Sequence, residues 1–533
     1  MVCGLSVALF MYSSDKDSLT YYGDAVSHLV AARKLFDWGE NPGWGQIGTV
    51  WLPLPHFLLM FPSFIDGLFF SGFAGLVISL PSHALTSALL YKIIARILSR
   101  LPNLDSRIIS YAAFSGALLY GVNPNFLYLG ITAMTEAPFM LFIVAAAYLL
   151  LRWYEEQQHQ HSETALKYLL LSSIFVSAAT LCRYEGWILP LFMICFPPLI
   201  LISRLRYKHD NTQPLNSAKV WDRTIAFTVL VCIISFSGII FWLAYNVINY
   251  GDPLEFANAR YYSAASQALG RSFRENLYLQ PYNVMSVYSF TAFQIFGPLV
   301  LAAAAIGYFM HIRTSEQKQM RRYLYIFLGL PPLFTILTLL IGIGEMAGEM
   351  SSWFNSRFVV LVGPLLMLLV GFFIAKQPKL ITGSRLLLVC VIAALFAFQL
   401  AAPTFGAVVT LADAKGGFTY KHAPFAVLTG EKIGSLYDGT GSIMIITGSA
   451  QEHRILLSSG LAFKNFDSII ESSTWKKSFY EPWNHNDKWI VIAKDPDSDG
   501  VSVVKYWNDR KALLEQYYET VFENEYYLIW KLK

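Results

Sequence analysis

Charged residues are scarce in this 533-residue chain, since Asp, Glu, Lys and Arg together make up only 14% of it. Soluble domains carry about 25% charged residues, so the composition argues against a soluble enzyme. Cysteines are also few, and the five present lie in apolar stretches without the spacing of a disulfide framework or a zinc site. The formal net charge of +4 is too small to indicate a nucleic-acid partner.

Hydrophobic residues, by contrast, make up 55% of the chain and aromatic residues 15%. A membrane-spanning helix needs about 20 largely apolar residues. We expect eleven such helices, at residues 1–12, 72–92, 108–126, 136–152, 167–182, 187–203, 224–248, 288–310, 323–344, 358–375 and 386–403. The first begins at Met1 without a basic flank, and no clear small-residue cleavage site follows it, so we interpret it as a shortened helix rather than a signal peptide. The sequence therefore predicts a polytopic α-helical membrane core over residues 1–403.

The loops between these helices predict the orientation of the core. The more basic set holds 18 basic and seven acidic residues and comprises 92–107, 152–167, 204–223, 311–322 and 376–385. Basic loops remain on the cytoplasmic side, so we expect the N-terminus inside and the alternate loops outside. These outside loops comprise 13–56, 123–135, 183–186, 249–287 and 345–357. The sequence thus predicts a multi-pass protein of the cytoplasmic membrane.

Residues 404–533 differ from the core because charged and turn-forming residues occur throughout. We expect strands at 442–448, 489–493, 521–523 and 526–532, and helices at 450–461 and 503–518. Strands that alternate with helices indicate a small α/β domain with a mostly parallel sheet. This domain has neither a glycine-rich phosphate loop nor a nucleophile elbow. The charge pattern of the loops places it on the extracytoplasmic side.

The first outside loop contains an acid-bearing helix, expected to run to Trp38. Asp24 lies where it could cap this helix, and capping does not exclude a catalytic role. At 3.6 residues per turn, His28 lies on the same face as Asp24, either as a site residue or as a polar interfacial side chain. Arg33 lies on the opposite, apolar face, where an unpaired charge is costly. We therefore expect Arg33 to meet a carboxylate or a lipid phosphate.

Further ionisable side chains are expected on the same side of the membrane. They are Glu136, Arg183, Glu185, Asp252, Glu345 and Arg357. Local explanations exist for several of them. Glu136 opens a helix whose dipole favours an acid, and Arg183 and Glu185 can pair with each other. Asp252 lies in a Gly-Asp-Pro turn. Their shared position nevertheless predicts acids and arginines that converge on one outside-facing cavity.

Such a convergence suits one kind of chemistry. A donor with a phosphate leaving group needs arginines to hold the departing charge. A hydroxyl acceptor needs a carboxylate to take its proton. A lipid-linked donor needs both groups at the level of the membrane.

At these motifs the chain resembles the integral-membrane glycosyltransferases of the GT-C superfamily, near the family-39-like enzymes related to protein mannosyltransferases and aminoarabinose transferases. The motifs are YYGDAVSHLVAAR (21–33), GTVWLPLPH (48–56), TEAP (135–138), RYEGW (183–187), YGDPLEF (250–256) and NSRF (355–358). The resemblance implies a polyprenyl-phosphate sugar donor and an inverting transfer to a protein, lipid or glycan. It implies Asp24 as base or as metal ligand, and Arg357 as the residue that faces the lipid phosphate. Glu136, Arg183 and Glu185 carry over as cavity residues.

Two departures from the related families leave the acceptor open. Protein mannosyltransferases commonly show adjacent acids in the first outside loop, whereas Asp24 is followed by Ala25. Oligosaccharyltransferases carry a Trp-Trp-Asp signature, for which this chain offers only Tyr506-Trp507-Asn508-Asp509. Whether a divalent metal takes part also stays open.

Two other classes of protein fit part of the pattern. A transporter or lipid flippase also buries charges in a polytopic protein, but such proteins often show paired halves, and no repeat occurs here. A non-catalytic scaffold would leave the one-sided charges unexplained. We therefore expect a membrane glycosyltransferase that uses a lipid-phosphate sugar.

Overall fold

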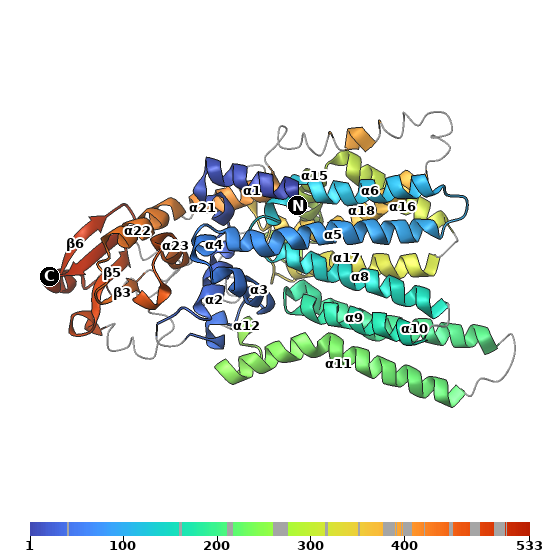
Figure 1. The fold of residues 1–533 in the computed structure, drawn as a ribbon, viewed down its shortest axis with the longest axis horizontal. Coiled ribbons are helices and arrows are strands. Elements are labelled where there is room, and N and C mark those ends of the chain that lie inside the picture. The colour runs from blue at the N-terminus through green and yellow to red at the C-terminus, as the bar shows by residue number, and fades with distance from the viewer. Residues whose placement is uncertain are drawn as a thin grey trace.

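A computed structural model gives the structure of the chain. It describes all residues except 40–41, 159–161, 210–216, 259–275, 315–317, 350–351, 377–389, 391, 396, 398–407, 421, 447–450, 469–479, 495–506 and 508. Long helices run side by side through one part of the molecule, and a β-sheet lies at the opposite end (Figure 1). Short helices from the N-terminal region lie between these two parts (Figure 1).

Long apolar helices form the core. They are α5 (Phe73–Ser99), α6 (Ser106–Val122), α8 (Glu136–Gln158), α9 (Ser162–Thr180), α10 (Leu189–His209), α11 (Ser217–Tyr250), α17 (Lys318–Leu340) and α18 (Gly363–Ala375). Within the described residues, five helices are long and apolar enough to cross a membrane, and a bent pair would make six. This architecture fits a polytopic membrane protein. The predicted span 386–403 lies largely outside the described residues, so the count of eleven stays a prediction.

The segment predicted as one continuous span, 288–310, is broken in the structure. Helix α15 (Pro281–Phe296) and helix α16 (Pro298–Arg313) meet at an angle of 108°. Gly297 between them has a φ of 76°, a left-handed conformation that glycine adopts without steric cost. Pro298 then starts a new helix, because proline lacks the N–H that a continuing helix needs.

The predicted break within 167–203 is confirmed. Helix α9 ends at Thr180, and a 3₁₀ helix, η3 (Tyr184–Ile188), precedes α10. Gly186 packs so closely on the end of α9 that an added Cβ would lie 2.6 Å from the carbonyl oxygen of Ala179. The tight turn therefore depends on a residue without a side chain.

Short elements join the core to the opposite end of the molecule. They are α1 (Val2–Ser14), η1 (Lys16–Thr20), α2 (Gly23–Lys34), η2 (Trp44–Ile47), α3 (Leu54–Ser63), α4 (Asp66–Phe70), α7 (Pro124–Leu129), α12 (Glu255–Asn258), β1 (Ala347–Glu349), β2 (Ser352–Phe354) and η4 (Ser356–Val362). Helix α2 ends four residues before the predicted end at Trp38. Its capping residue is Tyr22, without a side-chain cap, so Asp24 lies in the first turn of the helix and does not cap it.

The C-terminal sheet has five strands in the order β4-β3-β5-β7-β6. The strands are β3 (Ser442–Ile446), β4 (Phe466–Ser468), β5 (Asp487–Ala493), β6 (Tyr518–Glu523) and β7 (Tyr527–Leu532). Strand β3 pairs parallel with β4 and β5, whereas β7 pairs antiparallel with β5 and β6. The sheet is thus mixed rather than mostly parallel, because the tight β6–β7 hairpin reverses the chain direction.

Helices α21 (Val409–Tyr420), α22 (Ala423–Leu436) and α23 (Gln451–Ser459) connect this sheet to the core. A further helix, α26 (Lys511–Tyr517), packs against β6. On α23, the guanidinium of Arg454 donates to the carbonyls of Thr20 and Tyr21 at 2.8 Å each. The neighbouring His453 Nδ1 lies 2.8 Å from Ser27 Oγ. The C-terminal part of the chain therefore packs directly on the helix that carries Asp24.

Candidate active site

Arg357 lies near the start of η4 and is buried among groups from α2 and α8. Its Nη2 donates to the Asp24 carboxylate on α2. Its Nε lies 3.1 Å from Glu136 Oε1 at the start of α8. Its guanidinium also lies over the ring of Tyr22, 5.1 Å from the centroid. One arginine thus joins residues 24 and 136.

Glu136 is the centre of the arrangement. Its side chain is fully buried, and Oε1 meets both Arg357 and Arg183, the latter at 2.7 Å. Its second oxygen, Oε2, is buried and has no hydrogen-bond partner within the described part of the chain. A buried carboxylate is costly unless it is paired, so Glu136 depends on its two arginines.

Arg183 completes the chain of charges in the turn between α9 and α10. Its Nη2 lies 2.6 Å from Glu185 Oε1, and its Nη1 donates to Thr135 Oγ1 at 2.9 Å. Burial alone would lower the pKa of Arg183, but Glu185 and Glu136 outweigh burial and raise it. Arg183 is therefore held as a cation despite its burial.

These contacts form one continuous set, which we call the charge network. Its members, in order of contact, are Glu185, Arg183, Glu136, Arg357 and Asp24. The Asp24 side chain is the most accessible member, at 37% exposure against 11% or less for the others. The network therefore combines a buried, arginine-bearing interior with one carboxylate that reaches the surface.

Other predicted site residues lie apart from this network. Arg33 pairs with Asp37 and Asp66 on the far face of α2, so its predicted carboxylate partner is confirmed. Asp252 is exposed and accepts from Leu254 N and Asn258 Nδ2, as expected of a local turn.

Two further predicted residues lie near the network rather than in it. Glu345 is buried, and its backbone carbonyl accepts from the Asn355 side chain just before η4. His28 is buried, with Nδ1 3.0 Å from His56 Nε2. Burial lowers the pKa of His28 to about 4, although Asp24 acts in the opposite direction. His28 is therefore a neutral neighbour of the network at physiological pH.

One residue beside the network escaped the sequence analysis. Asp413 on α21 is buried and accepts from Ser356 N at 2.9 Å and from Ser356 Oγ at 2.8 Å. Nothing in its local sequence distinguishes it, because its partners lie far away in the chain.

The resemblance implies Asp24 as base or as metal ligand, and the structure bears on the second role through the residues around it. Among the described residues, no group of three or more His, Cys, Asp or Glu side chains is placed to hold a metal ion. Asp24 instead faces the guanidinium of Arg357. The side chains that the structure describes around Asp24 therefore do not fit a metal in this arrangement.

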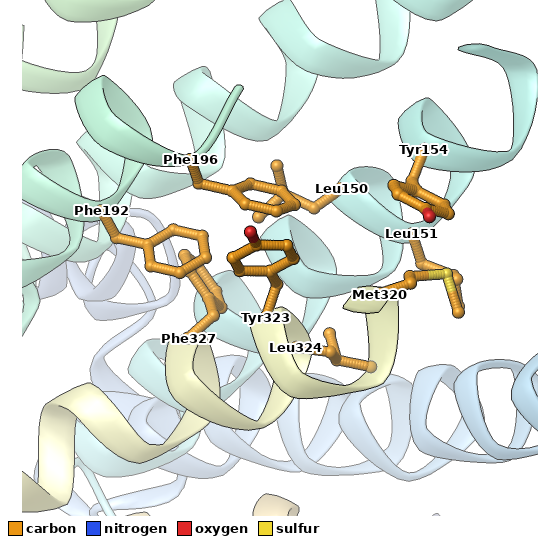
Figure 2. Close-up of a pocket in the computed structure, with 9 residues that line it drawn as sticks. All are labelled: Leu150, Leu151, Tyr154, Phe192, Phe196, Met320, Tyr323, Leu324 and Phe327. Atoms are coloured by element: carbon orange, nitrogen blue, oxygen red, sulfur yellow. The ribbon is translucent and has the colours of Figure 1, made fainter. Parts of the chain in front are cut away.

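A separate apolar pocket lies between α8, α10 and α17 (Figure 2). It is lined by Leu150, Leu151, Tyr154, Phe192, Phe196, Met320, Tyr323, Leu324 and Phe327. Leu150 follows Glu136 by 14 residues along α8, a rise of roughly 21 Å at 1.5 Å per residue. The pocket offers no carboxylate or arginine, so the charge network is the candidate for chemistry.

Comparison with known proteins gives a family match over part of the chain and a shared fold. Residues 82–250 match the family of dolichyl-phosphate-mannose-protein mannosyltransferases. This region holds Glu136, Arg183 and Glu185 but neither Asp24 nor Arg357. No curated protein matches the chain in sequence.

Among solved structures, ArnT from Cupriavidus metallidurans bound to undecaprenyl phosphate is similar, with a TM-score of 0.55 and 12% identity over 99% of this chain and 97% of that one. The apo oligosaccharyltransferase of Archaeoglobus fulgidus gives 0.47 and 13%, over 97% and 72%. The S. cerevisiae Pmt1–Pmt2 complex bound to the sugar donor gives 0.29 and 18%, over 51% and 36%. Residues 82–250 are thus similar to a family of protein mannosyltransferases, and the whole chain shares the fold of ArnT.

Proposed function

We propose that this protein transfers a sugar from a polyprenyl-phosphate donor to a protein, lipid or glycan acceptor, with inversion at the anomeric carbon. The reaction takes place at the outer face of the cytoplasmic membrane, with the N-terminus in the cytoplasm and the C-terminal domain, residues 404–533, outside. The observation that carries the proposal is the contact between Asp24 and Arg357. The residue expected to take a proton and the residue expected to hold a phosphate lie side by side.

Asp24 has the position that a general base needs. It is the network's most accessible carboxylate, so an acceptor hydroxyl can approach it from solvent. In the reaction, the hydroxyl proton passes to Asp24 as the acceptor oxygen bonds to the anomeric carbon. The bond between that carbon and the phosphate oxygen breaks on the opposite side. An inverting step of this kind needs one base and one stabilised leaving group.

Arg357 and Arg183 supply the stabilisation of the leaving group. Both guanidiniums are buried, and a charge-assisted contact is stronger where water is excluded. We infer that the donor phosphate competes with Asp24 for Arg357, because both are anions. Donor binding would thus release the Asp24 carboxylate for proton transfer. Undecaprenyl phosphate bound to ArnT supports a lipid-phosphate donor of this class.

The test is turnover of polyprenyl-phosphate sugars by the purified protein in liposomes, measured as release of polyprenyl phosphate. Asp24→Asn should abolish the release while expression and thermal stability stay normal. The matched control is Asp252→Asn, which makes the same change at an exposed turn outside the network. Equal turnover by the two variants would remove Asp24 from the proposed role.

A further inference from the structure

Asp413 connects two elements that each carry a network residue. Its Oδ2 accepts two hydrogen bonds from Ser356, at 2.9 Å from the backbone N and 2.8 Å from Oγ. The hydroxyl of Tyr22 donates to the same oxygen at 3.5 Å. Ser356 directly precedes Arg357, and Tyr22 precedes Asp24 by two residues. A single carboxylate oxygen thus contacts Ser356, which adjoins Arg357, and Tyr22, which lies two residues before Asp24.

The bonds to Ser356 fix the direction of η4. Asn355 has a left-handed φ of 53°, which turns the chain sharply before η4. The first N–H groups of a helix have no acceptor within it, and no side chain of η4's own segment caps it. Asp413 supplies the missing acceptor from α21. The geometry of the turn that presents Arg357 therefore depends on a residue in a different part of the chain.

The bond from Tyr22 fixes the surface on which Arg357 rests. The Tyr22 ring lies 5.1 Å from the Arg357 guanidinium, and Tyr22 is the capping residue of α2. A cation over an aromatic ring is held by the ring's negative face. Holding the Tyr22 hydroxyl thus orients both the ring beneath Arg357 and the first turn of α2, where Asp24 lies.

The pKa of Asp413 is raised, because burial outweighs Arg357 and the two bonds from Ser356, which act to lower it. A buried carboxylate costs free energy without such partners. Docking of α21 alone does not require it, because Thr410 on the same helix binds Asn125 through its backbone N at 3.0 Å and through its hydroxyl.

We propose that Asp413 is a positioning residue that sets the distance between Asp24 and Arg357 by holding Tyr22 and Ser356. The proposal rests on the function proposed above. The C-terminal part of the chain would thus contribute to transfer by aligning Asp24, the base, with Arg357, the residue that contacts the phosphate.

The test compares Asp413→Ala with Thr410→Ala, a matched change at a buried residue of the same helix that touches no network residue. Misplacement of reacting groups by about 1 Å can cost on the order of a hundredfold in rate. We expect a loss of that size in kcat for Asp413→Ala, with a smaller change in KM. Asp413→Asn should restore much of the loss, because an amide oxygen can still accept from Ser356. Equal kcat values for Asp413→Ala and Thr410→Ala would overturn the proposal.

A second measurement keeps this inference separate from the proposed function. If the wild-type protein transfers no sugar from any polyprenyl phosphate, the proposed function fails, and thermal unfolding then tests the positioning. Asp413→Ala, Arg357→Lys and the double variant form a cycle. We expect the effects of the two changes on unfolding to be non-additive, because the residues share Tyr22 and Ser356. Additive effects would show that Asp413 does not position Arg357.

Discussion

Helix α2 lies between two arginine–carboxylate clusters with different properties. On one face, Arg33 binds Asp37 and Asp66 at 2.8 Å each and donates to the Ser63 carbonyl. On the other face, Asp24 binds Arg357 in the charge network. Both arginines are buried, so burial of a guanidinium alone does not distinguish a structural pair from a reactive one.

The difference lies in how completely the groups are satisfied. Arg33 has two carboxylates and a carbonyl as partners, and three phenylalanine rings lie within 5.8 Å of its guanidinium. In the network, by contrast, Arg183 and Arg357 share one oxygen of Glu136, whose other oxygen has no hydrogen-bond partner among the described residues. A set of charges with fewer contacts than it can make has capacity for a ligand.

The same conservative change, made separately at Arg357 and at Arg33, tests most directly whether the two clusters differ in function. Lysine keeps the charge but loses the planar fork that contacts two groups. We expect Arg357→Lys to lower turnover on the order of a hundredfold, comparable to the loss of a donor to a developing charge. Arg33→Lys should retain turnover per folded molecule. Liposome assays of both variants, normalised to folded protein, decide the outcome, and a similar loss in both would show that the two clusters are not functionally distinct.

The pH dependence of the free energy of unfolding tests the environment of His28, which lies beside the charge network. Burial lowers the pKa of His28 to about 4; Asp24 favours its charged form, while Arg357 and Arg183 oppose it. Unfolding returns this pKa to about 6.5. Between about pH 6.5 and 4, His28 therefore binds a proton in the unfolded chain but not in the folded chain. Stability should therefore fall as pH drops from about 6.5 to 4, by at most about 1.4 kcal/mol per pH unit for one group. Chemical denaturation across this range should give a flatter profile for His28→Gln, and an unchanged profile would contradict the account.

A substitution in the Arg33 cluster should lower the free energy of unfolding rather than the turnover. Arg33→Gln leaves Asp37 without its cation, whereas Asp66 keeps its water because its side chain is 69% exposed. We expect a loss of roughly 2 kcal/mol, below the range for breaking a fully buried pair. Thermal unfolding in detergent measures this loss. A variant as stable as the wild type would mean that the cluster contributes nothing to the fold.

The smallest effect is expected at Asp252, which belongs to neither cluster. Its carboxylate accepts from the backbone N of Leu254 and from Asn258 in an exposed turn. Asp252→Asn should leave turnover unchanged, because exposed substitutions away from special features are usually mild. A clear loss of turnover would place this turn in the site after all.

The sequence predicted the network well because its members share one physical requirement. Charged groups at the membrane level must be paired, so acids and arginines expected on one side must meet. The structure joins Asp24, Glu136, Arg183, Glu185 and Arg357 in this way. Asp252 and Glu345, which were expected to converge with them, are not members of the network. The roles of the network residues in transfer remain predictions.

The sequence could not predict features that depend on distant packing. Asp413 has its partners at residues 22 and 356, and no local pattern links these positions. The 108° bend at Gly297 was hidden within a continuous apolar stretch. The antiparallel β5–β7 pairing likewise depends on where the final hairpin packs. Each of these features depends on contacts between segments far apart in the chain, and local sequence periodicity carries no information about such contacts.

The central claim is that the contact between Asp24 and Arg357 marks a site for sugar transfer from a lipid phosphate. The most direct test measures release of polyprenyl phosphate from polyprenyl-phosphate sugars by wild-type and Asp24→Asn protein in liposomes. We expect the wild type to release polyprenyl phosphate, and we expect the rate of release to fall at least about a hundredfold in Asp24→Asn, with unchanged folding. Equal release by the two proteins would contradict the central claim.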